Sequence, residues 1–119
     1  MKYVDGFVLP VPKSKLKLYR SIAQKAGKIW REHGALQYVE AIGEDMAVKF
    51  GVPFPKQIKL KAGEIVVFSW IVFKSRAHRD KVNAKVMADP RMNKIMGNSE
   101  MPFEIKRMVY GGFEFLVNA

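Results

Sequence analysis

No stretch of this chain constrains the fold more than the ten residues from Glu64 to Phe73, EIVVFSWIVF. Most of them are β-branched or aromatic, which is the composition of a β-strand. Alternation along a strand divides them between two faces, with Ile65, Val67, Ser69, Ile71 and Phe73 on one and Val66, Phe68, Trp70 and Val72 on the other. Both faces are apolar, so we predict a central strand in a sheet that is covered on both sides, one cover coming from another subunit.

Three more strands and two helices are predicted around this strand. The strands are residues 3–9, ended by Pro10 and Pro12, residues 35–44, and residues 107–118, in which Gly111 and Gly112 suggest a bulge or a close approach of another backbone. The helices are residues 14–33, with apolar residues at steps of three and four, and a segment from the capping residue Ser75 to about Ala88. Residues 45–63 form a long connection before the central strand.

The order strand, helix, strand, strand, helix, strand is the ferredoxin-like βαββαβ arrangement of the α+β class. It places both helices on one face of a four-stranded antiparallel sheet and leaves the other face bare. We expect two copies of the chain to cover the bare faces by pairing as a homodimer. The length of 119 residues fits a single domain over residues 1–119.

Composition excludes several functions. The chain has no cysteine, so it forms no disulfide and has no thiolate nucleophile or cysteine-ligated metal. No apolar run approaches the roughly 20 residues of a membrane helix, and we expect a cytoplasmic protein without a membrane partner. His33 and His78 lack metal-ligand spacing, and no cofactor motif is visible, so neither a metal nor a cofactor is predicted.

The formal net charge of +10 raises the question of an anionic partner. Basic residues on the outer helix faces would contact phosphates without reading bases, so any nucleic-acid binding is expected to be non-specific and salt-dependent. The central strand lacks the basic start and the glycine of RNA-recognition domains. A solvated basic surface is the simpler interpretation.

Two carboxylates are out of place among apolar neighbours, Asp5 in the first strand and Glu40 in the second. Each is either a structural partner of a polar side chain or part of a ligand site, and we favour the structural role. We expect Asp5 and Glu40 to lie on one sheet face near Arg107. The candidate ligand-binding residues of a cleft between sheet and helices are Asp5, Phe7, Tyr38, Glu40, Trp70, Met92, Met101, Phe103, Arg107 and Tyr110.

Several segments carry a family resemblance: KYVDGFV at 2–8, GAL and VE within 34–40, VVFSW at 66–70, DPRM at 89–92 and MPFEIKRMVYGGFE at 101–114. The sequence resembles the YbaA-like bacterial family of unknown function. This resemblance implies the fold of the dimeric α+β barrel proteins and spans nearly the whole chain, least clearly between residues 42 and 63. It implies no catalytic residues.

The function therefore has three interpretations. The first is a small protein that binds a partly apolar molecule in the cleft. The second, by analogy of fold alone, is an enzyme like the cofactor-independent oxygenases or the haem-degrading or stress-related dimeric α+β barrels. The third is an interaction or structural dimer, with non-specific nucleic-acid binding as a further alternative. Whether the chain is an enzyme stays open at this point.

Overall fold

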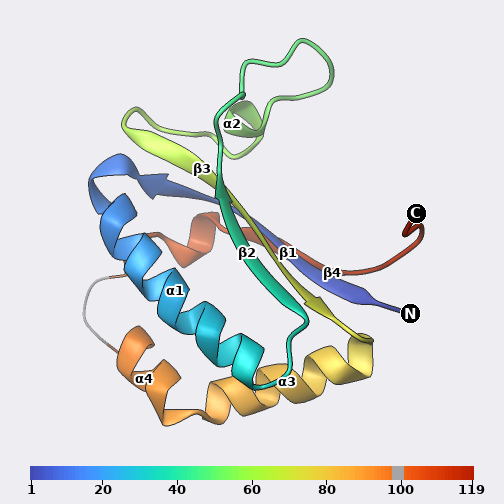
Figure 1. Cartoon of the computed structure of the whole chain (residues 1–119). Coiled ribbons are helices and arrows are strands. Elements are labelled where there is room, and N and C mark those ends of the chain that lie inside the picture. The colour runs from blue at the N-terminus through green and yellow to red at the C-terminus, as the bar shows by residue number, and fades with distance from the viewer. Residues whose placement is uncertain (98–100) are drawn as a thin grey trace.

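The computed structural model describes residues 1–97 and 101–119. The strands are β1 (Tyr3–Pro12), β2 (Gln37–Ile42), β3 (Glu64–Phe73) and β4 (Val109–Glu114). The helices are α1 (Leu16–Glu32), α2 (Phe54–Gln57), α3 (Arg76–Ala88) and α4 (Pro90–Met96), with 3-10 turns η1 (Lys13–Lys15) and η2 (Ile105–Arg107). Figure 1 shows α1, α3 and α4 together on one side of the strands.

The four strands form one antiparallel sheet in the order β2-β3-β1-β4. β1 and β3 are the central pair, and their register runs over ten residue pairs from Tyr3↔Phe73 to Pro12↔Glu64. This order, with the two crossover helices on one face, is the ferredoxin-like fold that the sequence predicts.

β3 has the predicted bounds, and its two apolar faces meet different surroundings. Val67, Ile71 and Phe73 are buried beneath the helices. On the opposite face Phe68 is 45% exposed, and Val109 and Phe113 of β4 are exposed on the same face. The helices of one chain therefore cover only one of the two apolar faces, which we call the helix face, and leave the other, the open face, in contact with water.

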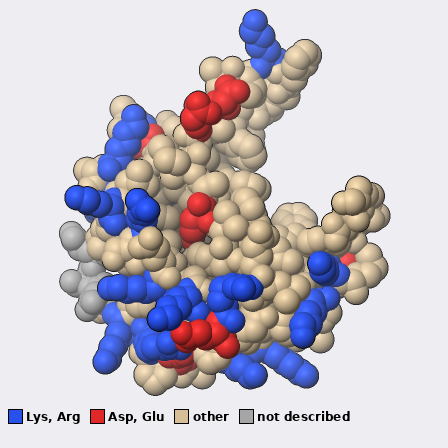
Figure 2. Space-filling model, viewed as in Figure 1, with Lys and Arg blue, Asp and Glu red and all other residues tan. Residues whose placement is uncertain are grey.

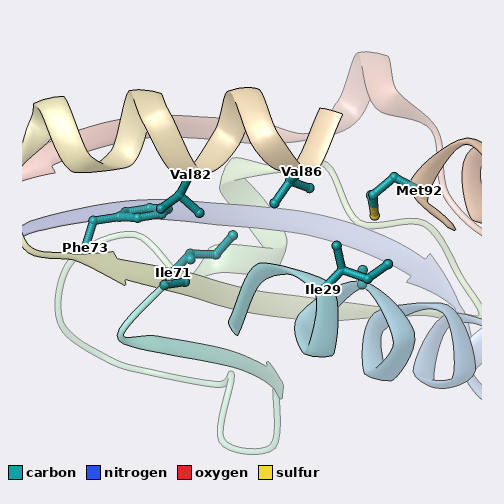
Figure 3. Packing of buried hydrophobic residues seen from close by; sticks show 8 residues of the cluster. Ile29, Ile71, Phe73, Val82, Val86 and Met92 are labelled. Carbon is teal, nitrogen blue, oxygen red and sulfur yellow. The ribbon is translucent and has the colours of Figure 1, made fainter. Parts of the chain in front are cut away.

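The helix face has two separate clusters of buried side chains. In the first, Val82 and Val86 point from α3 toward Phe73 and Ile71 of β3, with Ile29 and Met92 beside them (Figure 3). The second lies at the other end of the sheet and contains Leu9, Val11, Tyr19, Ala23 and Val67. The space between the two clusters is the cavity described in the next section.

The end of β1 differs from the prediction. Pro10 and Pro12 were expected to end the strand at Leu9, but β1 continues through both of them in register with β3. The pairing of β1 with β4 stops at Val8. Both prolines therefore lie where β1 has a partner on one side only, which is where a sheet tolerates a residue without an amide hydrogen.

The last strand is shorter than predicted. β4 covers Val109–Glu114 rather than residues 107–118, and its glycines form no bulge, because Gly111 and Gly112 continue the register with β1. Gly112 makes room for a side chain: a Cβ atom there would lie 2.7 Å from Cε2 of Tyr3. Gly112 therefore reflects a close approach within the sheet, whereas a Cβ atom at Gly111 would lie no closer than 3.7 Å to the ring of Phe113.

The connection from β2 to β3 extends beyond the body of the molecule (Figure 1). It contains the single-turn helix α2, and the ring of Phe54 in that turn lies 6.2 Å from the ring of Phe68 on the open face. Within the described ranges, no helix combines the length and apolarity needed to cross a bilayer.

Removing buried methyl groups from α3 tests this packing. Val86 is 0% exposed and Val117 is 79% exposed. We expect Val86→Ala to lower the free energy of unfolding by about 1.5–3 kcal/mol, since it loses buried apolar contact and leaves a small void. The matched change Val117→Ala should leave it nearly unchanged. Equal effects in urea titrations of both variants would contradict the packing of α3 on β3.

Candidate functional site

A cavity of about 380 Å³ lies between the sheet and the helices. Its walls come from β1, β2, β3, α1, α3, α4 and residues 101–108. Most of the lining side chains are aliphatic, aromatic or methionine, and the volume falls in the range of small-molecule sites. A cavity of this composition is suited to an apolar molecule with few polar groups.

The polar group of the cavity is a cluster of Glu40, Tyr19 and Tyr38, which we call the carboxylate cluster. The Tyr19 hydroxyl donates to Oε1 of Glu40 at 2.6 Å, and the Tyr38 hydroxyl donates to Oε2 at 2.7 Å. The two-residue period of β2 places Tyr38 and Glu40 on the same sheet face. The apolar face of α1 brings Tyr19 against them.

Burial and the adjacent carboxylate define the charge state of this cluster. Burial first, and then the negative charge of Glu40, raise the pKa of Tyr19 and of Tyr38 well above the usual range of a phenol. Both hydroxyls therefore keep their protons at neutral pH and remain donors. Glu40 receives its two hydrogen bonds from neutral groups.

A glycine in α1 makes this arrangement sterically feasible. The ring of Tyr38 packs directly on Gly27, where a Cβ atom would lie 2.6 Å from Cδ1 of the ring. The ring of Trp30, one turn further along α1, lies 5.9 Å from the Tyr38 ring. Any side chain at residue 27 would push Tyr38 away from α1 and disturb its hydrogen bond to Glu40.

A second hollow lies on the outer side of the carboxylate cluster, between α1 and the β2 edge. It has a volume of about 590 Å³ and shares Tyr19, Tyr38 and Glu40 with the cavity. Its other walls include the basic residues Arg20, Lys28 and Arg31. Figure 2 shows lysine and arginine gathered over the helical part of the molecule. We regard the cavity as the better ligand site, because its walls are almost entirely apolar, whereas the outer groove has several charged side chains in its walls.

Six of the ten candidate residues line the cavity, namely Phe7, Tyr38, Glu40, Met92, Met101 and Phe103. The other four do not. Asp5 is buried beneath α3, where Nη1 of Arg79 lies 2.9 Å from its Oδ1. Burial raises the pKa of Asp5, and Arg79 acts in the opposite direction.

Arg107 is in a different place from the one expected. It was predicted near Asp5 and Glu40, but its guanidinium forms a two-point ion pair with Glu64 at the start of β3, with distances of 2.6 and 2.9 Å. Its Nη2 also donates to the carbonyl of Lys59. Arg107 therefore links η2 to the start of β3 and to the connection that precedes it. The expectation that Asp5 and Glu40 share a sheet face is met, because both point toward the helices.

Trp70 and Tyr110 also lie outside the cavity. Trp70 is on the open face, where its indole N–H donates to Oε1 of Gln37 at 3.0 Å. Tyr110 of β4 is on the helix face but exposed, and it stacks on Phe7 with ring centroids 5.7 Å apart. It covers the outer side of a residue that lines the cavity.

Several lining residues were not among the sequence candidates, namely Tyr19, Trp30, Ser69, Met87, Asn93, Met96 and Met108. One signal was available for Tyr19. A tyrosine on the buried face of a helix needs a hydrogen-bond partner, and a carboxylate in an apolar strand needs donors. Matching these two needs would have paired Tyr19 with Glu40.

Both histidines lie away from the cavity. Nε2 of His33 lies 2.8 Å from Oδ2 of Asp89, and Nδ1 of His78 accepts from the backbone amide of Lys74. Residues 1–97 and 101–119 contain no group of three His, Asp or Glu side chains that could hold a metal ion. The titratable group that the cavity offers to a bound molecule is the Glu40 carboxylate.

Comparison with known sequences decides the family. A family model described as "Protein of unknown function (DUF1428)" matches residues 2–105. The chain belongs to this family. The uncharacterized protein YbaA of Escherichia coli (strain K12) is 48% identical over 118 residues, with 99% of each chain covered, and the Shigella flexneri protein of the same name matches equally. The resemblance noted from the sequence is confirmed.

Solved structures share the fold with low sequence identity. Rv0793 from Mycobacterium tuberculosis has a TM-score of 0.60 and 11% identity, and covers 100% of this chain and 99% of its own. A dimeric ferredoxin-like protein from an uncultured marine organism has a TM-score of 0.61 and 10% identity, with 99% and 98% covered. At these identities the likeness establishes the ferredoxin-like fold of this DUF1428 member and nothing about its ligands.

The Glu64–Arg107 pair gives a test by pH. Hydrogen bonds from Arg107 hold the pKa of Glu64 below its ordinary value of 4.5. The stabilisation is therefore fully present above that value and is lost as the pH falls through the lower pKa of the folded state. We expect Glu64→Gln to lower the melting temperature by a few degrees at pH 7.

The difference between wild type and Glu64→Gln should shrink below about pH 4.5, since protonated Glu64 resembles glutamine. The exposed Glu44→Gln serves as the control for a change of charge alone. Thermal melts of the three proteins between pH 3 and 7 measure both quantities. A difference that grows as the pH falls would show that Arg107 does not stabilise the Glu64 carboxylate.

Proposed function

We propose that the protein binds a small, partly apolar molecule in the cavity between the sheet and the helices. The observation that carries this proposal is an apolar cavity of about 380 Å³ with one carboxylate in its wall. Protein interiors are normally packed as densely as organic crystals, and a void loses the contacts of its lining atoms. A molecule that fills the space restores those contacts and stabilises the fold.

The flexible lining supports binding of a guest molecule. Five of the seven methionines of the chain line the cavity, namely Met87, Met92, Met96, Met101 and Met108. Methionine side chains are unbranched and polarizable, so they adapt to ligands of different shape. The polar groups Ser69 and Asn93 add hydrogen-bonding capacity next to Glu40.

The methionine methyl groups provide the test. We expect 3-phenylpropan-1-ol, a neutral probe, to shift the methyl NMR signals of the five cavity methionines in protein labelled with ¹³C at the methionine methyls. Met1 and Met46 lie outside the cavity lining and serve as internal controls. Equal shifts at all seven methionines would indicate non-specific association, and no shift up to millimolar probe would contradict the proposed function.

We also propose that two copies of the chain pair through their open faces. The structural relative described as dimeric has the same fold, which makes this arrangement a reasonable expectation here. The open face presents Phe68, Val109 and Phe113 as exposed apolar side chains. Exposed apolar surface of this kind is typical of protein–protein interfaces. A two-fold axis would bring this face against itself, so that each copy covers the other.

The extended segments fit the same arrangement. The connection between β2 and β3 and the C-terminal segment both project from the body (Figure 1), and the space-filling view is hollowed between them (Figure 2). Their exposed apolar residues include Phe50, Val52, Leu116 and Val117. A second copy seated on the open face would lie between the two segments and bury these side chains.

Two substitutions with similar exposure test the dimer. Phe68 is 45% exposed on the open face and Leu18 is 41% exposed on the outside of α1. We expect sedimentation of the wild type at micromolar concentration to give twice 13.6 kDa. Phe68→Asp should produce the 13.6 kDa monomer and Leu18→Asp should leave the dimer intact, because a desolvated carboxylate opposes burial. A monomeric wild type, or dissociation of both variants alike, would contradict pairing through the open face.

The other interpretations from the sequence stay predictions. They are an oxygenase-like or stress-related enzyme, non-specific nucleic-acid binding through the basic helix faces, and a cytoplasmic location. No specific contact favours one of them over ligand binding.

A further inference from the structure

Among the described residues that line the cavity, Glu40 is the only charged side chain. Within residues 1–97 and 101–119, none of the ion pairs includes it. Its two hydrogen-bond donors are tyrosine hydroxyls, which carry no charge. The described residues therefore give the carboxylate of Glu40 no ion-pair partner.

The carboxylate still has acceptor capacity toward a ligand. Each of its oxygens receives one tyrosine hydrogen bond, Oε1 from Tyr19 and Oε2 from Tyr38. A carboxylate has about four lone-pair sites, so about two remain. The tyrosines thus orient Glu40 without saturating it, and a donor placed in the cavity would complete its hydrogen bonds.

The walls around Glu40 favour a cation over a neutral donor. Aromatic rings from Phe7, Tyr19, Trp30, Tyr38 and Phe103 line the same space. The faces of such rings attract ammonium groups, most strongly where water is excluded. The indole N–H of Trp30 is engaged with Oδ1 of Asn83 at 2.9 Å, so its polar edge is already occupied.

The buried carboxylate of β1 provides a comparison within the same sheet. Asp5 lies on the same face as Glu40, and Arg79 from α3 supplies its positive charge. Removing one partner of a buried ion pair is costly, because the remaining charge is left without compensation. Among residues 1–97 and 101–119, none forms such an ion pair with Glu40. The adjacent space is large enough to admit a cation with an apolar body.

We propose that the cavity selects a small organic amine, with its ammonium group on Glu40 and its hydrocarbon part among the methionines. This inference rests on the proposed function of the same cavity. At roughly 30 Å³ for each water volume, 380 Å³ is room for about a dozen waters, or a ligand of about ten non-hydrogen atoms. We infer an amine because its positive charge complements the Glu40 carboxylate. We infer an apolar body for the ligand because the cavity walls are apolar.

The net charge of the protein opposes the binding of an amine. A formal charge of +10 repels a cation and attracts an anion through the long-range field. The outer groove with Arg20, Lys28 and Arg31 would likewise favour an anionic molecule. A preference for an amine therefore has to come from the local charge of Glu40 inside the cavity.

Three probes of the same carbon skeleton test the selection: 3-phenylpropylamine, 3-phenylpropan-1-ol and 3-phenylpropanoate. Titrations followed by calorimetry and by the methionine methyl signals, at pH 7 and about 150 mM salt, measure the three affinities. We expect the amine to bind at least about ten-fold more tightly than the alcohol, and the carboxylate to bind most weakly.

Two variants make the same change of charge at different places. Glu40→Gln makes it inside the cavity, and Glu44→Gln makes it at an exposed position. Glu40→Gln should abolish the preference for the amine and leave the affinity for the alcohol within about three-fold. Glu44→Gln should retain the wild-type order.

The outcomes separate the two proposals. If the alcohol or the carboxylate binds as well as the amine in the wild type, the amine inference is wrong and the proposed function stands. If none of the three probes shifts the cavity methionines, both are wrong. If folded Glu40→Gln keeps the preference for the amine, the assignment to Glu40 is overturned. The wild-type comparison is decisive even if Glu40→Gln fails to fold.

Discussion

The ten residue pairs between β1 and β3 are the constraint on which the rest of the structure depends. A strand displays alternate residues on opposite faces, so this register assigns every side chain of the two central strands to one face of the sheet. Asp5, Phe7, Ser69 and Ile71 lie toward the helices, and Trp70 lies away from them. A slip of one residue would bury the present open face and expose the cavity wall.

The helix face is not filled uniformly. α3 packs against the Phe73 end of β3, and the first half of α1 packs against the Leu9 end of β1. α1 and α4 span the space between these clusters with alanines and methionines, which leave a cavity in the middle. Close packing is therefore achieved on either side of the cavity, in the two clusters of buried side chains.

The two carboxylates of the helix face, Asp5 buried and Glu40 half-buried, are held in different ways. Asp5 has a guanidinium partner from α3, while Glu40 has two neutral hydroxyls. The sequence identified both residues as exceptions in apolar strands, because that inference needs only the pattern within each strand. That they share a face follows from the register of β1 and β2 with β3. The sequence could not identify their partners. Arg79 is 74 residues from Asp5, and Arg107, the partner expected for these carboxylates, instead pairs with Glu64.

The sequence by itself determined the order of elements, the central position of β3, the faces of its side chains and the family. These follow from local periodicity and composition, or from long matching segments. Only the tertiary structure decided that β1 continues through Pro10 and Pro12, that Gly112 accommodates Tyr3, and that Tyr19 from α1 joins Tyr38 at Glu40. Such contacts depend on distances between segments remote in the chain, and packing of whole elements sets those distances.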